Sequence, residues 1–239
     1  MNLVIDYGNS AAKVGIFDHQ NLVAKHTFGE EGKLKDFLQS TTAEHIIISS
    51  VKTNPEVISS WLENNGKTFI LDPSLPLPVT NKYRTPQTLG VDRLAAACGA
   101  QYLFPNRNCL AIDAGTCITY EFVDADGNYH GGGISPGLKM RFQAVHTFTA
   151  RLPLITPTES PKLIGDSTES CIQSGVINGL IAEIEGIIDR YTSQYKELQV
   201  ILCGGDTPFF ENKLKASIFA SPELVLVGLN SILIHNVNL

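Results

Sequence analysis

The sequence predicts an α/β fold built from two similar domains. Short runs rich in β-branched residues alternate with longer segments of helical periodicity, a pattern typical of α/β architecture. A strand–Asp-x-Gly–strand motif occurs twice, 107 positions apart, and such a repeat indicates duplicated domains. The length of 239 residues agrees, since it allows one large domain or two small ones.

Strands are expected at short apolar, β-branched runs bounded by turn-forming residues. These runs lie at residues 3–6, 14–17, 46–50, 68–71, 109–113, 119–123 and 199–203. Helices are expected where apolar residues recur at helical spacing. These segments lie at residues 34–39, 55–64, 91–102, 140–149, 172–195 and 207–214.

Two further segments are less regular. Residues 72–78 are expected to form an extended surface loop, because their three prolines cannot continue a helix or a central strand. The last stretch, residues 224–236, begins as a strand-like apolar run and ends as a helix, with Gly228 inside it.

The internal repeat pairs residues 5–10, Ile-Asp-Tyr-Gly-Asn-Ser, with residues 112–117, Ile-Asp-Ala-Gly-Thr-Cys. Each copy follows one predicted strand and precedes another. If the repeat reflects a duplication, one domain spans residues 1–107 and the other residues 108–239. The alternative is a chance similarity between two β-hairpins.

The first turn has the residue types that bind a phosphate. Gly8 allows close backbone approach to an anion, and Asn9 and Ser10 can donate hydrogen bonds to its oxygens. Lys13 supplies positive charge, and Asp6 could hold a divalent ion. The alternative is a hairpin with an Asx-turn and an exposed lysine. Neither a GxxxxGK[ST] P-loop nor a strand–GxGxxG–helix unit occurs in the chain.

The second turn repeats this design. Asp113 stands at a strand end beside Gly115, where its carboxylate could bind a cation, and the Thr116 hydroxyl could reach a phosphate. Together the two turns predict a phosphate-binding cleft between two domains.

Two glycine-rich segments are further candidates. Residues 131–137 are interpreted as a loop before a helix, which either contacts a ligand through its backbone or is a tight turn with no ligand. Residues 203–206, Cys-Gly-Gly-Asp, turn from a strand into a helix, the usual place for a nucleotide in α/β folds. A plain turn with Asp206 as the helix N-cap is equally compatible with the sequence.

An acid and a cation stand together where the helix at 91–102 begins. Asp92 and Arg93 could form an ordinary ion pair, or could abstract a hydroxyl proton and hold a substrate carboxylate. Ser167 and Thr168 precede a long helix, where the simplest role is an N-cap.

Composition argues against several classes of protein. The net charge of −6 disfavours a general nucleic-acid binder, which needs a basic surface. No run of about 20 apolar residues is evident, and the first residues lack the basic and apolar regions of a signal peptide. The five cysteines are scattered without a CxxC motif, and the six histidines show no metal-ligand spacing. Reduced thiols in the cytoplasm, no membrane and no zinc site are therefore expected.

Taken in order, these motifs resemble those of type III pantothenate kinases, a branch of the acetate and sugar kinase/actin-like ATPase superfamily. The resemblance covers nearly the whole chain. It rests on residues 6–13, 48–51, 83, 90–93, 113–116, 132–137, 167–175 and 204–206. Two positions depart from the family pattern: Ser10 stands where Thr is commoner, and Glu121 stands where an Asp is frequent, so no family role is carried over to Glu121.

The resemblance implies two ribonuclease-H-like domains around an inter-domain cleft, and transfer of the ATP γ-phosphate to the primary hydroxyl of pantothenate. It also implies a homodimer. Another small-molecule kinase of the superfamily, or a non-enzymatic accessory factor, remains the alternative. Bottom-up chemistry agrees with a kinase, because phosphoryl transfer depends mainly on positioning and on neutralising charge.

The resemblance also implies roles for individual residues. Asp92 corresponds to the general base, Asp6 to a possible Mg²⁺ ligand, and Asp113 to the ligand of a monovalent cation, potassium or ammonium. The ATP-binding positions are Asp6, Tyr7, Gly8, Asn9, Ser10, Ala11, Ala12, Lys13 and Thr116. The pantothenate-binding positions are Tyr83, Gly90, Val91, Asp92, Arg93 and Thr168.

Overall fold

In the computed structural model, which describes residues 1–62 and 66–239, the chain forms two sheets that share one strand order. The first sheet has the order β3-β2-β1-β4-β5. Its strands are β1 (Asn2–Tyr7), β2 (Ala12–Asp18), β3 (Asn21–Phe28), β4 (His45–Ser50) and β5 (Lys67–Ile70). The first three are antiparallel neighbours, whereas β4 is parallel to both β1 and β5.

The second sheet repeats this order as β9-β8-β7-β10-β11, with β6 added beside β9. Its strands are β6 (Thr80–Asn81), β7 (Cys109–Ala114), β8 (Cys117–Val123), β9 (Asn128–Pro136), β10 (Gln199–Cys203) and β11 (Phe219–Ala220). Strand β10 is parallel to both β7 and β11, as β4 is to its neighbours. Asp113 is the penultimate residue of β7, as Asp6 is of β1. The repeat seen in the sequence is therefore also present in the strand topology.

The helices complete both halves. They are α1 (Glu31–Ser40), α2 (Pro55–Ser59), α3 (Val91–Leu103), α4 (Leu138–Thr147), α5 (Thr168–Gln173), α6 (Gly179–Gln194), α7 (Thr207–Phe210) and α8 (Leu224–Val237). A 3₁₀ turn (Pro86–Thr88) precedes α3, and a π-helical turn (Ser174–Asn178) joins α5 to α6.

Several expected elements differ from those observed. The glycine-rich residues 131–137, interpreted as a loop, are mostly strand β9, and β3 was not expected because it is a half-exposed edge strand. The expected strand-like start at 224 is wrong, since α8 is helical from Leu224 onward. Helix α2 ends at Ser59, and the expected end at residue 64 lies outside the described residues. The proline-rich residues 72–78 form neither helix nor strand, as predicted.

The chain divides into two compact units. Unit 1 contains residues 1–107, 121–131 and 223–239, and unit 2 contains residues 108–120 and 132–222. Unit 2 begins at the predicted boundary, but α8 belongs to unit 1 because it packs on α3 and on β1 and β4. The division into domains 1–107 and 108–239 therefore stays a prediction.

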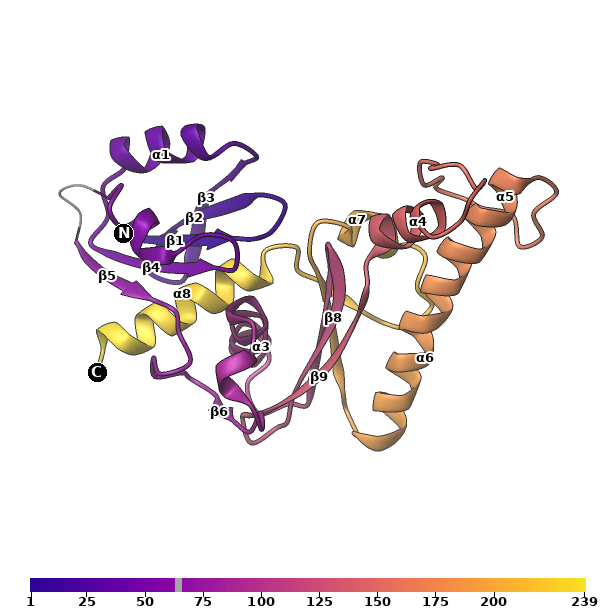
Figure 1. Ribbon diagram of the computed structural model, residues 1–239. Coiled ribbons are helices and arrows are strands. Elements are labelled where there is room, and N and C mark those ends of the chain that lie inside the picture. The colour runs from indigo at the N-terminus through magenta and orange to yellow at the C-terminus, as the bar shows by residue number, and fades with distance from the viewer. Residues whose placement is uncertain (63–65) are drawn as a thin grey trace. The chain divides into compact units, whose positions relative to one another are not determined.

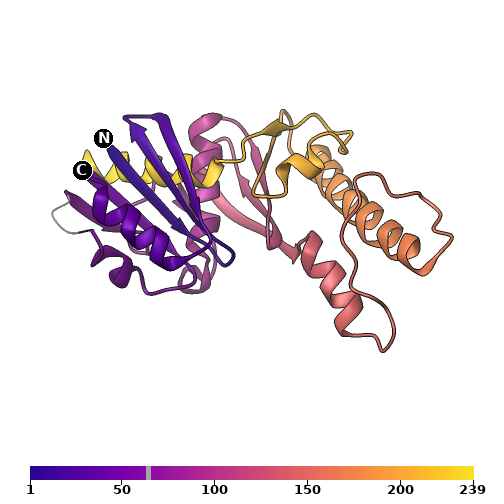
Figure 2. The same cartoon turned by 90° about the horizontal axis from the view of Figure 1, so that it is seen from above.

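Unit 1 has an apolar layer on each face of its sheet. Leu3, Ile5 and Tyr7 alternate along β1 and pack against Leu34 and Leu38 of α1. Helix α8 lies on the opposite face, and Figures 1 and 2 show α1 and the yellow α8 on the two sides of β1–β3. Both chain termini lie in this unit.

Helices α3 and α8 cross within unit 1 at two glycines. A Cβ on Gly228 would lie 1.8 Å from the Ala95 carbonyl oxygen, and one on Gly99 would lie 2.5 Å from the Leu224 carbonyl oxygen. The two backbones are therefore in direct contact, which only glycine permits at these positions. Near its C-terminal end, α8 also holds the proline-rich loop, since Asn236 Nδ2 donates to the Pro76 carbonyl at 2.8 Å.

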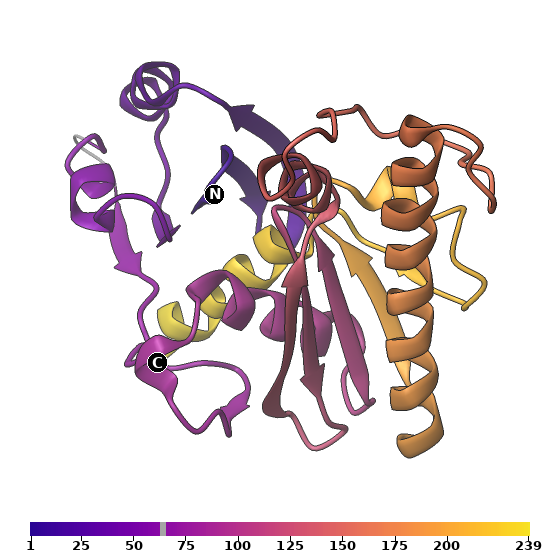
Figure 3. The same cartoon turned by 45° about the vertical axis from the view of Figure 1, so that its right-hand side comes forward.

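The core of unit 2 lies between its sheet and the long helical segment, drawn in orange in Figure 3. Leu110, Ile112 and Leu202 from the strands pack with Ile177, Leu180, Ile184 and Ile188 from the helices. Residues 168–194, in the part of the chain that the structure describes, are long and apolar enough to cross a membrane by length and composition. The buried residues of this segment, among them Ile177, Ile184 and Ile188, pack in the core of unit 2.

Candidate active site

The turn between β1 and β2 is tight and presents small side chains to solvent. The Gly8 N–H donates to the Ala11 carbonyl at 3.2 Å, and Asn9 and Ser10 are exposed. In the antiparallel pairing of the two strands, Asp6 lies opposite Lys13. The turn therefore carries two polar side chains at its tip and an acid and a base at its foot.

Asp6 itself is buried, with 9% of its surface exposed, and the Ser49 hydroxyl lies 3.5 Å from Asp6 Oδ1. Tyr7 and Ala12 point into the core of unit 1. The Tyr7 hydroxyl donates to Glu31 at 3.3 Å, and burial together with this carboxylate raises the pKa of Tyr7. The side chains of Tyr7 and Ala12 thus support the turn, so any contact they make with a nucleotide runs through their backbone.

In unit 2, three loops meet at the end of β7. Gly204, with φ of +92°, lies so close that a Cβ would stand 2.2 Å from Asp113 Oδ1 and 2.4 Å from the Ala114 carbonyl oxygen. The Asp206 N–H donates to that same carbonyl at 2.8 Å. On the other side, the Gly137 N–H donates to the Thr116 carbonyl at 3.2 Å, just before α4.

This meeting point holds more polar groups than the sequence motifs alone indicated. Burial raises the pKa of the Asp206 carboxyl, and the nearby charge of Lys139 on α4 partly offsets that effect. Asp206 occupies the N-cap position of α7, yet within the described residues its side chain makes no capping hydrogen bond. Asp206 therefore stands at the N-cap position that one of the two interpretations expected, but its side chain does not cap the helix.

The third group of residues lies at the start of α3 in unit 1. Gly90 is the N-cap residue, and a Cβ there would lie 2.5 Å from Asp92 Oδ1. The same Oδ1 accepts the backbone N–H of Arg93 at 2.9 Å. Asp92 is half-buried, as are Gly90 and Val91, so one carboxylate oxygen is fixed against the helix start.

Arg93 forms its ion pair with Glu121 on β8. Arg93 Nε donates to Glu121 Oε1 at 2.6 Å, and Nη2 donates to Oε2 at 2.9 Å. Tyr129 on β9 donates its hydroxyl to the same carboxylate at 2.6 Å. Tyr83 completes the group, because the guanidinium lies over its ring at 5.6 Å from the centroid.

Glu121 is the member of this group to which the sequence assigned no role. It is a charged residue inside a strand that is otherwise apolar or weakly polar, and none of its surface is exposed. A fully buried carboxylate requires partners, so a charge in the middle of a buried strand is the signal that could have identified it.

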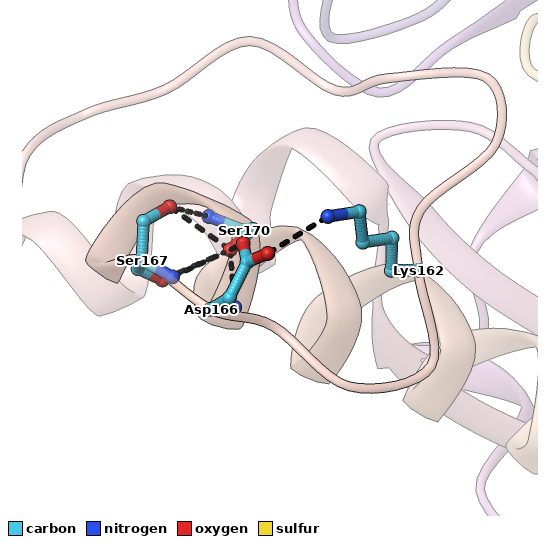
Figure 4. A network of polar contacts seen from close by, with 4 residues as sticks. All are labelled: Lys162, Asp166, Ser167 and Ser170. Carbon is cyan, nitrogen blue, oxygen red and sulfur yellow. Dashed lines mark hydrogen bonds and ion pairs between the residues drawn. The ribbon is translucent and has the colours of Figure 1, made fainter.

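Thr168 lies in unit 2 as the first residue of α5, and it is exposed. The helix start beside it is strongly capped: Ser167 Oγ accepts the Ser170 N–H at 3.2 Å, and Ser170 Oγ accepts the Ser167 N–H at 2.8 Å. Asp166 accepts from Ser170 and pairs with Lys162 at 2.8 Å (Figure 4). The N-cap expected at Ser167 is confirmed.

The predicted residues thus fall into two sets. Unit 1 contains the turn at 6–13 and the pantothenate positions 83 and 90–93, whereas unit 2 contains Asp113, Thr116 and Thr168. Within unit 1, Tyr83 and Arg93 are in contact and Asp92 adjoins them.

Oxygen atoms at both turns are possible cation ligands. No group of three His, Cys, Asp or Glu side chains among residues 1–62 and 66–239 could hold a metal ion unaided. Mg²⁺ does not need one, because it usually binds one or two carboxylates together with water and substrate phosphates. Asp6 fits that role. Two oxygen atoms, Asp113 Oδ1 and the Ala114 carbonyl oxygen, lie close to Gly204. Such oxygen donors are suited to a hard monovalent cation.

Comparison with known proteins identifies the family. The family model of type III pantothenate kinase matches residues 2–190. A type III pantothenate kinase from Phocaeicola vulgatus is 47% identical over 241 residues, with 99% of each chain covered. Another from Christiangramia forsetii is 45% identical over 240 residues, also with 99% of each chain covered.

Solved structures share the fold. One from Campylobacter jejuni, described as a Baf family transcriptional activator, superposes with a TM-score of 0.66 at 23% identity, covering 99% of this chain and 100% of the other. A ROK hexokinase from Thermus thermophilus gives 0.54 at 13% identity, covering 99% and 98%. At these identities the likeness concerns the fold alone. It confirms the predicted α/β class of the actin-like ATPase type, with two sheets.

Proposed function

This chain belongs to the type III pantothenate kinase family, and we propose that it transfers the γ-phosphate of ATP to the primary hydroxyl of pantothenate, the first step of coenzyme A biosynthesis. The observation that carries the proposal is the start of α3, where a carboxylate fixed by a backbone N–H adjoins a buried, oriented arginine. That pair suits a substrate with a hydroxyl at one end and a carboxylate at the other.

In the proposed mechanism, Asp92 is the general base. The Arg93 backbone N–H donates to Asp92 Oδ1, and this hydrogen bond fixes the orientation of the carboxylate. The other oxygen, Oδ2, then accepts the proton of the attacking hydroxyl. Arg93 and Tyr83, with Gly90 and Val91, bind the rest of pantothenate, and Thr168 supplies a further contact. A charge-assisted bond from the guanidinium to the pantothenate carboxylate orients the hydroxyl.

We assign the ATP-binding roles residue by residue within each turn. Asn9 and Ser10 donate to phosphate oxygens, Lys13 supplies positive charge, and Thr116 contacts the nucleotide. Asp6 would hold Mg²⁺, which would neutralise phosphate charge, and Asp113 would hold a potassium or ammonium ion. The exposed tip and the buried foot of the first turn support this division of roles.

A coupled assay of ADP release with and without pantothenate tests the proposal. We expect release that depends on pantothenate and requires Mg²⁺. A panel of other hydroxyl compounds separates this activity from that of another small-molecule kinase. ADP release that pantothenate does not increase would contradict the proposal.

A dependence on monovalent cation is the next prediction. We expect low activity in sodium or Tris buffer and a several-fold rise on adding potassium or ammonium. The reason is the oxygen-lined position of Asp113 beside Gly204, where a weakly hydrated cation can be held. In Asp113→Asn, rates compared across the same salts should no longer respond. Equal wild-type rates in all of these salts would count against the cation role.

We also propose a homodimer. The isoleucines of α6 do not support it, because Ile184 and Ile188 lie in the unit-2 core. The support comes from four large apolar side chains left exposed between residues 148 and 164. They are Phe148 (86% exposed), Leu154 (53%), Leu163 (82%) and Ile164 (80%). Exposed apolar groups concentrated in one segment are typical of an interaction surface.

Light scattering tests the dimer. We expect a mass near twice the 26.0 kDa of one chain, and a shift toward the monomer in the double variant Phe148→Ser/Ile164→Ser. Val57→Ser, which changes an exposed apolar residue of α2, is the matched control and should leave the mass unchanged. A wild-type monomer at micromolar concentration would rule the dimer out.

The proposed setting is the cytoplasm. All five cysteines, which lie in the described ranges, are free thiols, and Cys98, Cys109 and Cys203 are buried. Reduced, buried thiols suit a reducing compartment. The net charge of −6 disfavours nucleic acid as a partner.

A further inference from the structure

We infer that Glu121 is a positioning residue for pantothenate. By accepting hydrogen bonds from one edge of the Arg93 guanidinium, it orients the other edge toward the substrate. The inference rests on the proposed function, since it takes Arg93 as a pantothenate contact. It concerns a residue that belongs to neither phosphate turn.

The contacts of Glu121 leave it little freedom. Its carboxylate accepts three hydrogen bonds, two from Arg93 and one from Tyr129, at 2.6 to 2.9 Å. It is fully buried, and the Arg93 side chain is only 9% exposed. The two Arg93 bonds are parallel, and this bidentate geometry fixes the plane of the guanidinium as well as its distance.

A guanidinium has five N–H donors, and Glu121 uses two of them, on Nε and Nη2. Glu121 does not use the three other N–H groups, two of which are on Nη1, and the guanidinium also forms a hydrogen bond with Tyr83. Because the plane is fixed, the direction of these groups is fixed as well. A substrate carboxylate would therefore meet donors that are already oriented, which lowers the entropic cost of binding.

The two tyrosines pack together beside this guanidinium. The rings of Tyr83 and Tyr129 stack at 6.3 Å between centroids with an interplanar angle of 14°. Gly131 makes room for this stack: its φ is +93°, and a Cβ there would lie 2.8 Å from the Tyr83 ring. The group of Arg93, Glu121, Tyr83 and Tyr129 is therefore packed around one orientation of the guanidinium.

Charge explains why a neutral replacement is not equivalent. Burial lowers the pKa of Arg93, but the hydrogen bonds and negative charge of Glu121 outweigh it and raise that pKa above its usual value. An arginine buried without a counter-charge is costly, so it turns toward water. Loss of the Glu121 charge should therefore redirect Arg93 while the phosphate turns stay unchanged.

Steady-state kinetics of Glu121→Gln and Glu121→Asp test the inference. We expect the KM for pantothenate to rise about 10- to 100-fold in Glu121→Gln, the loss typical of a misdirected charge-assisted hydrogen bond, with the KM for ATP within twofold. Glu121→Asp keeps the charge on a shorter side chain, so its KM for pantothenate should lie between those of the wild type and Glu121→Gln. Glu223→Gln, which removes the charge of another ion pair in unit 1, with Lys25, is the matched control and should change neither KM.

Thermal melts of the same samples separate positioning from folding. If Glu121→Gln does not fold, Glu121→Asp tests the inference in the same way, by a raised KM for pantothenate with an unchanged KM for ATP. The inference would be overturned by a folded variant in which the KM for pantothenate and the KM for ATP rise together, or in which neither of them rises. Failure of both variants to fold would also overturn it. Wild-type protein without pantothenate-dependent activity would instead overturn the proposed function, and the inference with it.

Discussion

Replacing Asp92 by Asn should lower kcat by about 10²- to 10⁴-fold, the contribution typical of a positioned general base. The amide cannot accept the hydroxyl proton. It does retain an oxygen that can accept the Arg93 N–H, now bound by Asp92 Oδ1 at 2.9 Å. The free energy of unfolding should therefore fall by no more than about 1 kcal/mol, the range of a helix-cap change.

Steady-state kinetics and a thermal melt on one sample separate the two effects. ATP binding should survive, because Asp6 and Asp113 are untouched. Asp36→Asn, which removes an exposed acid on α1, is the control for the charge change itself. If Asp92→Asn melted normally and kept more than about a tenth of the wild-type kcat, Asp92 would not be the base.

Gly228→Ala should destabilise the protein by about 3 kcal/mol, the upper part of the usual range for overpacking, since its Cβ would stand 1.8 Å from the Ala95 carbonyl oxygen. Because this neighbour is a backbone atom, α3 and α8 must move apart. For a chain of this size the melting temperature should fall by about 6–12 °C. Differential scanning fluorimetry measures the shift.

Gly186→Ala is the matched control, because it is the same change within a helix, α6, at a position where a Cβ would have no described neighbour within 4 Å. Alanine is the better helix former by about 1 kcal/mol, so this variant should melt slightly higher. Equal melting temperatures for the two variants would mean that the two helices do not meet at Gly228.

The sequence was informative where local chemistry decides the structure. The repeated Asp-x-Gly turn predicted two similar domains, and in the structure each copy joins two neighbouring strands of its own sheet, because a tight turn depends on small residues close in sequence. Ser167 was correctly predicted as an N-cap for a similar reason. Glycine content was a less reliable indicator of a loop. Residues 131–137 have the composition of a loop but form most of β9, because pairing with neighbouring strands overrides the local preference.

Long-range partners could not be predicted. Arg93 was expected beside Asp92, and its actual partner, Glu121, is 28 residues further along the chain on another element. No local pattern encodes that distance. Helix α8 shows the same limit, since its apolar run fits a buried strand or a buried helix equally well, and only packing on α3 decides between them.

The contact between α3 and α8 also bears on how the protein folds during synthesis. Helix α3 has left the ribosome long before α8, its partner in unit 1, has been translated, because more than half of the chain lies between them. Until then the surface of α3 around Gly99 stays uncovered, and the helix whose first turn contains Asp92 lacks its main support. The residues of the unit-2 core are therefore translated before those that complete the helix pair behind the proposed catalytic base. Released chains that end before Leu224 should accordingly be protected from protease in unit 2 and cleaved readily around α3.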